Sequence, residues 1–206
     1  MTESATTTPK GRRRRNPEAT REDIITAART VLASDGPDGL SLSKVAHLAG
    51  VNRGTAYQHF ETREDLIKAT VEWVSRHLSE NILGGEARSD ASIGDNPVAM
   101  FDVINGLATF AVENPELGRF WLFEMLSSDN PEDDVFFSHF HKSTAAMTAS
   151  DVSEPGIDAE VLSVLMLAGY FLWPVWVRSK ARTKKERNAM ARRMSREVLR
   201  LTLHGT

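Results

Sequence analysis

Residues 42–60 constrain the fold of this chain more than any other stretch, because they hold two short helical patterns joined by a tight turn. In the first pattern, apolar side chains recur with the i, i+3, i+4, i+7 spacing of one helix face, at Leu42, Val45, Ala46 and Ala49. Gly50 follows at once, where a left-handed helix cap needs a residue without a Cβ atom. The sequence therefore predicts a helix over residues 43–49 that ends at Gly50.

The second pattern is a short helix over residues 53–59 that starts after Asn52. The side-chain oxygen of Asn52 is expected to cap its free N–H groups. Ala56 and Phe60 would face inward. The outward positions carry hydrogen-bond donors and no acid, at Arg53, Thr55, Tyr57 and His59. A short donor-rich helix that is supported by a second helix has the geometry of a helix-turn-helix, which places one helix in the major groove of DNA.

Helical patterns flank this segment on both sides. Pro17 opens the preceding helix, whose apolar stripe ends at the turn residues 34–39. Thr62 and Asp65 have the spacing of a capping box and start a long helix that is expected to end between residues 81 and 85. We therefore predict a three-helix DNA-binding head over residues 17–62, followed by a connecting helix.

Five more helices are predicted in the remainder of the chain, over residues 97–112, 115–126, 132–149, 157–178 and 184–203. The fourth of these is the most apolar and is expected to be buried nearly all round, with a kink at Pro174. No stretch alternates with period two, so no sheet is expected. The predicted fold class is all-α, with a helix-turn-helix head, a helical C-terminal body and about nine helices.

Charge is unevenly distributed along the chain. Residues 10–68 contain 11 basic and 8 acidic side chains, residues 84–160 contain 3 and 15, and residues 178–206 contain 10 and 2. DNA is therefore expected at the N-terminal end, because the acidic middle would repel it. Residues 1–16, with Lys10 and four consecutive arginines, are expected to form a disordered basic arm. The arm is either a solvated tail or a segment that orders on phosphates or in a minor groove.

Several kinds of chemistry find no support in the sequence. The chain has no cysteine, which excludes disulfides, thiolate catalysis and zinc sites with sulfur ligands. No phosphate-binding glycine loop and no nucleophile elbow is present. His139 and His141 stand two residues apart, so on a helix they point in different directions and make a poor metal pair. We expect no metal, no cofactor and no enzymatic activity.

The sequence also bears on location. The N-terminal residues contain no apolar core of a secretory signal. The longest apolar run, residues 161–177, is short and is interrupted by Gly169 and Pro174, so no membrane span is expected. A cytoplasmic location is therefore predicted.

Residues 43–66 resemble the DNA-binding signature of the TetR family of transcriptional regulators. The matching positions are Val45-Ala46, Ala49-Gly50-Val51, Gly54-Thr55, Tyr57, His59-Phe60, Glu64 and Leu66. The resemblance covers about the first third of the chain. It implies a fold of nine or so helices, in which residues 63–206 form a ligand-binding and dimerisation domain. The last two helices would pack across a two-fold axis as a four-helix bundle.

The resemblance also implies roles for individual residues. Asn52, Arg53, Gly54 and Thr55 would face base edges, and Arg53 could fork onto the O6 and N7 atoms of guanine. Tyr57 and His59 would donate to phosphates. Ser43, Lys44 and Arg63 are further phosphate candidates, since Arg63 stands where the family usually has a lysine. Ala56 replaces the larger apolar residue that is usual at its position.

The aromatic residues of the body are candidates for an effector site. Taken one by one they are ordinary core residues, but together they suit an apolar pocket between helices. The candidate residues are Trp73, Phe101, Trp121, Phe123, Phe140, Met166, Tyr170 and Trp173. We therefore expect a small apolar or aromatic effector.

These observations predict a homodimeric repressor of transcription that binds a palindromic double-stranded DNA operator and is released by its effector. Two other interpretations remain open. One is an activator or a global DNA-binding protein with the same head. The other is a helical protein that binds a ligand or a partner and whose head is vestigial.

Overall fold

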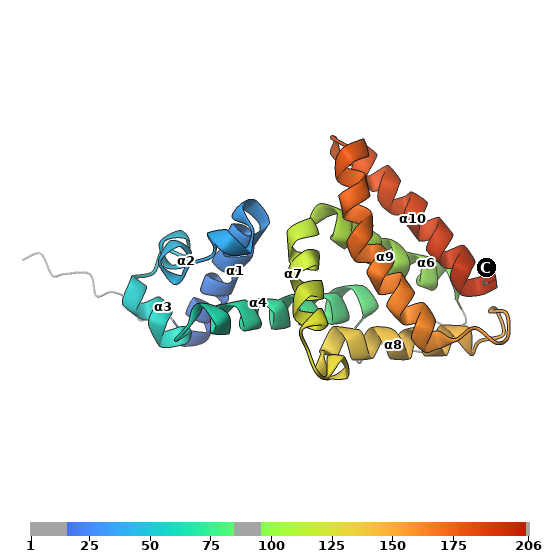
Figure 1. Cartoon of the computed structure of the whole chain (residues 1–206), viewed down its shortest axis with the longest axis horizontal. Helices are drawn as coiled ribbons and strands as arrows, with labels where there is room; N and C mark the ends of the chain where they lie inside the picture. The colour runs from blue at the N-terminus through green and yellow to red at the C-terminus, as the bar shows by residue number, and fades with distance from the viewer. Residues whose placement is uncertain (1–15, 85–95, 205–206) are drawn as a thin grey trace, which may run out of the picture.

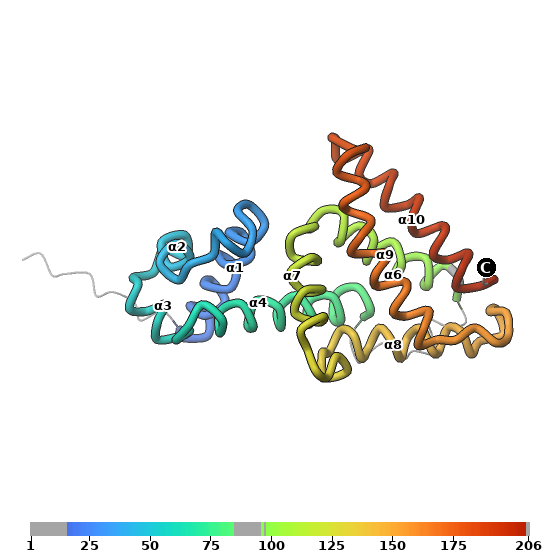
Figure 2. Tube along the Cα trace, viewed as in Figure 1, coloured from blue at the N-terminus to red at the C-terminus, as the bar shows by residue number. Residues whose placement is uncertain are grey.

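The computed structural model of the chain describes residues 16–84 and 96–204. The predicted basic arm lies outside these ranges, except for Asn16. Within them the chain forms nine α-helices and no β-strand, which confirms the all-α prediction. Figures 1 and 2 show a head of three helices at one end and a larger helical body at the other, with one long helix running between them.

The head consists of α1 (Pro17–Asp35), the short turn η1 (Pro37–Gly39), α2 (Leu42–Leu48) and α3 (Arg53–His59). The bounds of α3 are those predicted. Helix α2 starts one residue earlier than predicted, because the Ser41 hydroxyl caps it by accepting the N–H of Lys44 at 3.2 Å. Gly50 follows α2 with a φ of 66°, the left-handed conformation expected of this position.

The connecting helix is α4 (Arg63–Leu78). Both arms of its predicted capping box are present: the N–H of Asp65 donates to the Thr62 hydroxyl at 3.0 Å, and the N–H of Thr62 donates to the Asp65 carboxylate at 3.0 Å. The chain continues as a π-helical turn, η2 (Ser79–Leu83), and ends at Gly84 with a φ of 94°. The predicted end of this helix is therefore confirmed.

The body contains α6 (Pro97–Glu113), α7 (Pro115–Leu126), η3 (Pro131–Asp133), α8 (Val135–Thr148), α9 (Ala159–Lys180) and α10 (Lys184–His204). Two helices start later than predicted because an aspartate caps each of them. The Asp134 carboxylate accepts the N–H of Phe137 at 2.9 Å, and the Asp158 carboxylate accepts the N–H of Val161 at 3.0 Å.

An aromatic cluster fills the centre of the body. It joins Trp121 of α7, Phe136 and Phe140 of α8, and Tyr170 and Phe171 of α9, with neighbouring ring centroids 4.9–6.4 Å apart. The approach of α7 to α9 depends on Gly118, because a Cβ atom there would lie 2.7 Å from the Phe171 ring. The core thus ties α7, α8 and α9 together.

The prediction that α9 is buried nearly all round is wrong. One side packs against the body through Met166, Leu167, Tyr170, Phe171 and Val177. The other side is open and apolar, with exposed fractions between 53% and 64% at Val161, Val164, Leu165, Leu172, Val175 and Trp176. By length and apolarity α9 could cross a membrane, although a third of its most apolar window is buried in the body. The apolar residues of α9 therefore lie partly in the core and partly on an exposed face.

Candidate nucleic-acid interface and body cavities

The N-terminus of α3 is held by Asn52. Its side-chain oxygen accepts the N–H of Thr55 at 2.7 Å and the Thr55 hydroxyl at 3.0 Å. A Cβ atom at Gly54 would lie 3.3 Å from the same oxygen, which is a tight approach. Gly54 therefore leaves room for the cap, and of the Asn52 amide only the NH₂ group stays available to DNA.

Arg53 and Tyr57 form the outer ridge of α3. The Arg53 Nη2 donates to the Tyr57 hydroxyl at 3.3 Å, and the guanidinium carbon lies 5.3 Å from the centre of the tyrosine ring. Tyr57 is 40% exposed, whereas Ala56 is fully buried and Phe60 nearly so. The predicted inward positions are thus confirmed, and His59 lies half-buried beyond Tyr57.

The two candidates on α2, Ser43 and Lys44, are both exposed. The Lys44 ammonium forms an ion pair with the Asp35 carboxylate at the end of α1. This contact lowers the pKa of the Asp35 carboxyl, because Lys44 donates a hydrogen bond to it. A phosphate near Lys44 would therefore compete with Asp35.

Arg63 does not project as a free cation. Its Nη2 donates to the Pro37 carbonyl at 2.7 Å and its Nε donates to the Leu40 carbonyl at 3.1 Å. Its Nη1 lies 3.6 Å from the Glu64 carboxylate. The side chain therefore ties α4 to the segment that precedes α2. This geometry counts against the sequence-based prediction that Arg63 anchors a phosphate, which depended on its charge and position alone.

The candidate effector residues do not gather around one cavity. Trp121, Phe140, Met166 and Tyr170 are buried in the body. Trp73 lies between Arg29 and His77, with the Arg29 guanidinium 3.3 Å from its ring centre. The Trp173 Nε1 donates to the Met190 carbonyl at 3.2 Å, which holds α9 to α10. Phe101 is half-buried on α6. Phe123 is 63% exposed on α7.

The space beside Tyr170 is almost closed, with a volume of about 10 Å³. Its walls come from α4, α6, α8 and α9. The sequence did not predict the lining residues other than Tyr170, which are Leu78, Leu107, Phe110, Ala111, Phe136, Leu167 and Phe171. The Tyr170 hydroxyl is buried and has no hydrogen-bond partner among the described residues. Burial raises the pKa of this phenol. Among the described residues that line this space, Tyr170 is the only one whose side chain carries a polar atom.

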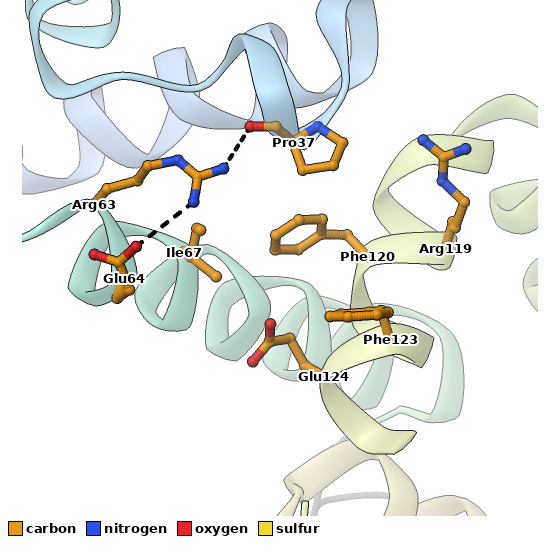
Figure 3. Close-up of a pocket in the computed structure, with 8 residues that line it drawn as sticks. All are labelled: Pro37, Arg63, Glu64, Ile67, Arg119, Phe120, Phe123 and Glu124. Atoms are coloured by element: carbon orange, nitrogen blue, oxygen red, sulfur yellow. Dashed lines mark hydrogen bonds and ion pairs between the residues drawn. The ribbon is translucent and has the colours of Figure 1, made fainter. Parts of the chain in front are cut away.

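A much larger groove lies where the head meets the body (Figure 3). Its volume is about 620 Å³. The lining residues come from η1, α4 and α7: Pro37, Arg63, Glu64, Ile67, Arg119, Phe120, Phe123 and Glu124. Sequence reasoning did not bring these residues together, because no local pattern links three separated segments.

Within residues 16–84 and 96–204, no group of three or more histidine, aspartate or glutamate side chains could hold a metal ion. His139 and His141, whose spacing makes a poor metal pair, have other contacts. The His139 Nδ1 lies 2.9 Å from the Ser79 hydroxyl, and the His141 Nδ1 lies 3.4 Å from the Ser163 hydroxyl.

The head also matches a known family in sequence. The family described as bacterial regulatory proteins of the tetR family matches residues 24–70, which include α2, α3 and most of α1. Residues 24–70 are therefore a TetR-family DNA-binding domain. The resemblance found in residues 43–66 is thereby confirmed.

Two curated proteins are similar to the TetR-family head. The HTH-type transcriptional regulator CymR of Pseudomonas putida is 38% identical over 61 residues, which are 30% of each chain. The HTH-type transcriptional repressor BepR of Brucella suis is 33% identical over 96 residues, which are 46% of this chain and 44% of BepR. The matched region thus spans less than half the length of these relatives.

Solved structures extend the likeness to the body. The fatty acid degradation regulator FadR of Bacillus halodurans has a TM-score of 0.67 at 18% identity, covering 90% of this chain and 95% of FadR. A tetR-family regulatory protein from Rhodococcus has a TM-score of 0.63 at 17% identity, covering 89% and 96%. At these identities the likeness concerns the fold alone, and it extends over both the head and the body.

Proposed function

We propose that this TetR-family chain is a transcriptional repressor that binds a near-palindromic operator as a homodimer and is released by a small apolar effector. The observation that carries the proposal is the orientation of α3. Buried Ala56, and Phe60 directly after the helix, fix α3 on the head, so that Arg53 and Tyr57 face outward. The name of BepR as a repressor favours repression over activation.

Base reading falls to the first turn of α3. Arg53 would leave its contact with Tyr57 and fork onto guanine O6 and N7, a contact worth about 1–3 kcal/mol of discrimination. The Asn52 NH₂ group and the Thr55 methyl are further base contacts, and Gly54 brings the backbone close to the groove. Ser43, Lys44, Tyr57 and His59 would contact phosphates. Arg63 is left out of this set, because its guanidinium is bonded to backbone carbonyls.

The open apolar face of α9 is the proposed dimer contact. Leu172, Val175 and Trp176 are each more than half exposed, a cost that a second copy would remove by burying them. Dimerisation would place two α3 helices in successive major grooves, about 34–36 Å apart. In this proposal residues 17–62 form the DNA-binding domain, and residues 63–206 bind the effector and the second copy of the chain.

The effector is proposed to enter the aromatic cluster beside Tyr170. The unpaired Tyr170 hydroxyl supports this, because a buried polar group without a partner loses about 1–3 kcal/mol relative to a paired one. The space must widen from its present 10 Å³, which would shift α4 through Leu78 and α8 through Phe136. Since α4 continues into the head, effector binding and DNA binding would be reciprocally coupled.

Selection of bound sequences from a random DNA pool tests the DNA-binding half of the proposal. We expect an inverted repeat with half-sites about one helical turn apart. Arg53→Ala should relax base preference at one position in each half-site, while Arg200→Ala, on the far helix α10, should leave the selected sequence unchanged. Failure to enrich any sequence would favour the vestigial-head interpretation. A reporter driven by the selected site then separates repression from activation.

Titration of tryptophan fluorescence with neutral aromatic compounds tests the effector half. A compound that binds saturably should release the protein from its operator. Tyr170→Phe should weaken compounds that carry a hydrogen-bonding group and spare those without one. If Tyr170→Phe bound each kind of compound as tightly as the unchanged protein does, Tyr170 would not be part of the effector site.

A further inference from the structure

The groove between head and body has the size of a small-molecule site. Its volume of about 620 Å³ falls within the range of about 300–1,000 Å³ that ligand pockets occupy. One wall belongs to the head side of the molecule, with Pro37 of η1 and Ile67 of α4. The facing wall belongs to α7 of the body, with Phe120 and Phe123 (Figure 3). The groove is separate from the closed space beside Tyr170, since the two share no lining residue.

The apolar part of the groove includes an aromatic ring that the fold leaves uncovered. Phe120 is 8% exposed and forms part of the core, whereas Phe123 is 63% exposed. In Figure 3 both rings project from α7 into the space in front of α4, on the same side as Ile67. A flat molecule placed there would cover the Phe123 ring and rest against Phe120 and Ile67. Covering an exposed aromatic ring with another apolar surface is favourable.

Among the residues that the structure describes, each charged side chain of the groove except one has an ionic or hydrogen-bonding partner. Arg63 bonds to two backbone carbonyls and lies 3.6 Å from Glu64. Arg119 forms an ion pair with Glu116, a residue that does not line the groove. Glu124 makes no ion pair or side-chain hydrogen bond with any residue that the structure describes. Figure 3 shows its carboxylate in the space between α4 and α7. Among the described residues that line the groove, the charged group without a partner is therefore the negative carboxylate of Glu124.

We propose that this groove binds a small organic cation with a flat apolar body. The ring stacks on Phe123 and the cationic group pairs with the Glu124 carboxylate. An aromatic face and a carboxylate next to each other in the chain both attract a cation, the first through the ring quadrupole and the second through its charge. Anions of the same shape are repelled by Glu124. The proposal concerns binding to the free protein and does not depend on the proposed DNA-binding function.

Binding at this place also has a mechanical consequence. The ligand touches η1 and the first turns of α4 on one side and α7 on the other. It therefore holds the head against the body, much as Arg63 already holds α4 against Pro37 and Leu40. Backbone segments on both walls should open less often when the site is filled.

Two naphthalene probes of opposite charge test the proposal directly. The full-length protein is titrated with 1-naphthylmethyl-trimethylammonium and with 1-naphthaleneacetate, and binding is followed by the fluorescence anisotropy of the naphthalene. We expect the cation to bind saturably. The anion should bind with an affinity that is at least about tenfold lower. Glu124→Gln should lower the affinity for the cation about tenfold. It should therefore reduce the difference in affinity between the two probes. Phe123→Ala should weaken both probes.

Matched variants outside the groove serve as controls. Glu132→Gln removes an exposed carboxylate, and Leu126→Ala removes an exposed apolar side chain from the same helix as Phe123. Neither should change either affinity. Thermal unfolding checks that all four variants fold, which is expected because Phe123 and Glu124 are not buried.

Hydrogen exchange then locates the bound cation. Exchange should slow in residues 37–40, 63–67 and 119–124, on both walls of the groove. Equal affinity for the two probes, unchanged affinity in Glu124→Gln, or slowing confined to residues 166–171 beside Tyr170 would each overturn the proposal.

Discussion

The guanidinium carbon of Arg29 in α1 lies 3.3 Å from the ring centre of Trp73 in α4. Trp73 stacks in turn on His77, with ring centroids 4.7 Å apart and ring planes within 14° of each other. His77 then approaches Phe110 of α6 at 5.8 Å. These four side chains form a continuous row that leads from the head through α4 into the body. Trp73, which the sequence suggested for the effector site, is therefore in contact with Arg29 and His77.

The first prediction concerns the strength of the contact between Arg29 and Trp73. In a double-mutant cycle of Arg29→Met and Trp73→Leu, urea unfolding should give a coupling free energy of about 1 kcal/mol. The Arg29→Met variant alone should lose less free energy of unfolding than the coupling free energy. The substitution also removes the Arg29 Nε donor, which is buried without a hydrogen-bond partner among the described residues, and this removal offsets part of the loss. The exposed pair of Lys180 and Trp176, 5.4 Å apart, should couple more weakly. Coupling near zero in both pairs would reduce the Arg29 contact to ordinary packing.

The second prediction concerns pH. Burial, and then the charge of Arg29, lower the pKa of His77, while Glu80 opposes them. The unfolded chain, with a histidine pKa of about 6.5, therefore binds a proton more readily than the folded protein. The stabilising contribution of neutral His77 is complete above about pH 6.5 and is lost as the pH falls from there through the lower folded pKa.

Urea unfolding at pH 7.5, 6.5 and 5.5 measures this effect. His77→Gln should lose less stability on acidification than the unchanged protein. His204→Gln, at the exposed end of α10, should behave like the unchanged protein. Parallel loss of stability in all three proteins would show that His77 does not carry the pH dependence.

Local features of the fold were predictable from sequence, because their causes lie within a few residues. The cap of α3 needs only Asn52 and Thr55, and the capping box of α4 needs only Thr62 and Asp65. The partners of Arg63 are more distant along the chain, since Pro37 and Leu40 belong to another element. No periodicity could have revealed them.

The body was harder to predict for a similar reason. Gly118 permits the approach of Phe171, a contact between helices that leaves no trace in either local sequence. The apolar pattern of α9 shows that many of its residues avoid water, but it does not distinguish a face that meets the core from a face that is open. The groove around Phe123 and Glu124 likewise exists only because three segments converge.

The third prediction separates the role of Asn52 as the cap of α3 from its proposed role in DNA binding. Asn52→Ala should lower the free energy of unfolding by about 1 kcal/mol, because the N–H of Thr55 loses its acceptor. Asn52→Asp keeps an acceptor and should retain stability, yet it should weaken DNA binding by adding a negative charge near the phosphates. Chemical denaturation and DNA titration of the same preparations provide both readouts. If Asn52→Asp bound DNA normally, Asn52 would lie away from the duplex.

The fourth prediction concerns the open face of α9. Leu172→Glu, at a residue that is 64% exposed, should convert the proposed dimer into a folded monomer, because a carboxylate would be buried in the contact. Leu126→Glu, at a residue of α7 that is 78% exposed, should leave the dimer intact. Sedimentation velocity measures both. A dimer that survives Leu172→Glu would have its contact on another face.

The last prediction concerns Arg63, for which sequence and structure suggest different roles. If Arg63 contacts a phosphate, Arg63→Met should reduce by about one the slope of the logarithm of the DNA-binding constant against the logarithm of salt concentration. The stability of the variant should then be nearly unchanged. The hydrogen bonds to Pro37 and Leu40 give the opposite expectation. Losing hydrogen bonds from a charged donor costs about 1.5–3 kcal/mol each at most, so the unfolding free energy should fall clearly while the salt slope stays constant.

Two further variants sharpen this test. Arg63→Lys should recover only part of the stability, because an ammonium group lacks the planar fork that reaches two carbonyls at once. Lys44→Met should show the converse behaviour, with a reduced salt slope and a small change in stability, since its ion pair with Asp35 is exposed. If Arg63→Met instead behaved like Lys44→Met, the guanidinium would have to leave Pro37 and Leu40 for a phosphate when DNA binds.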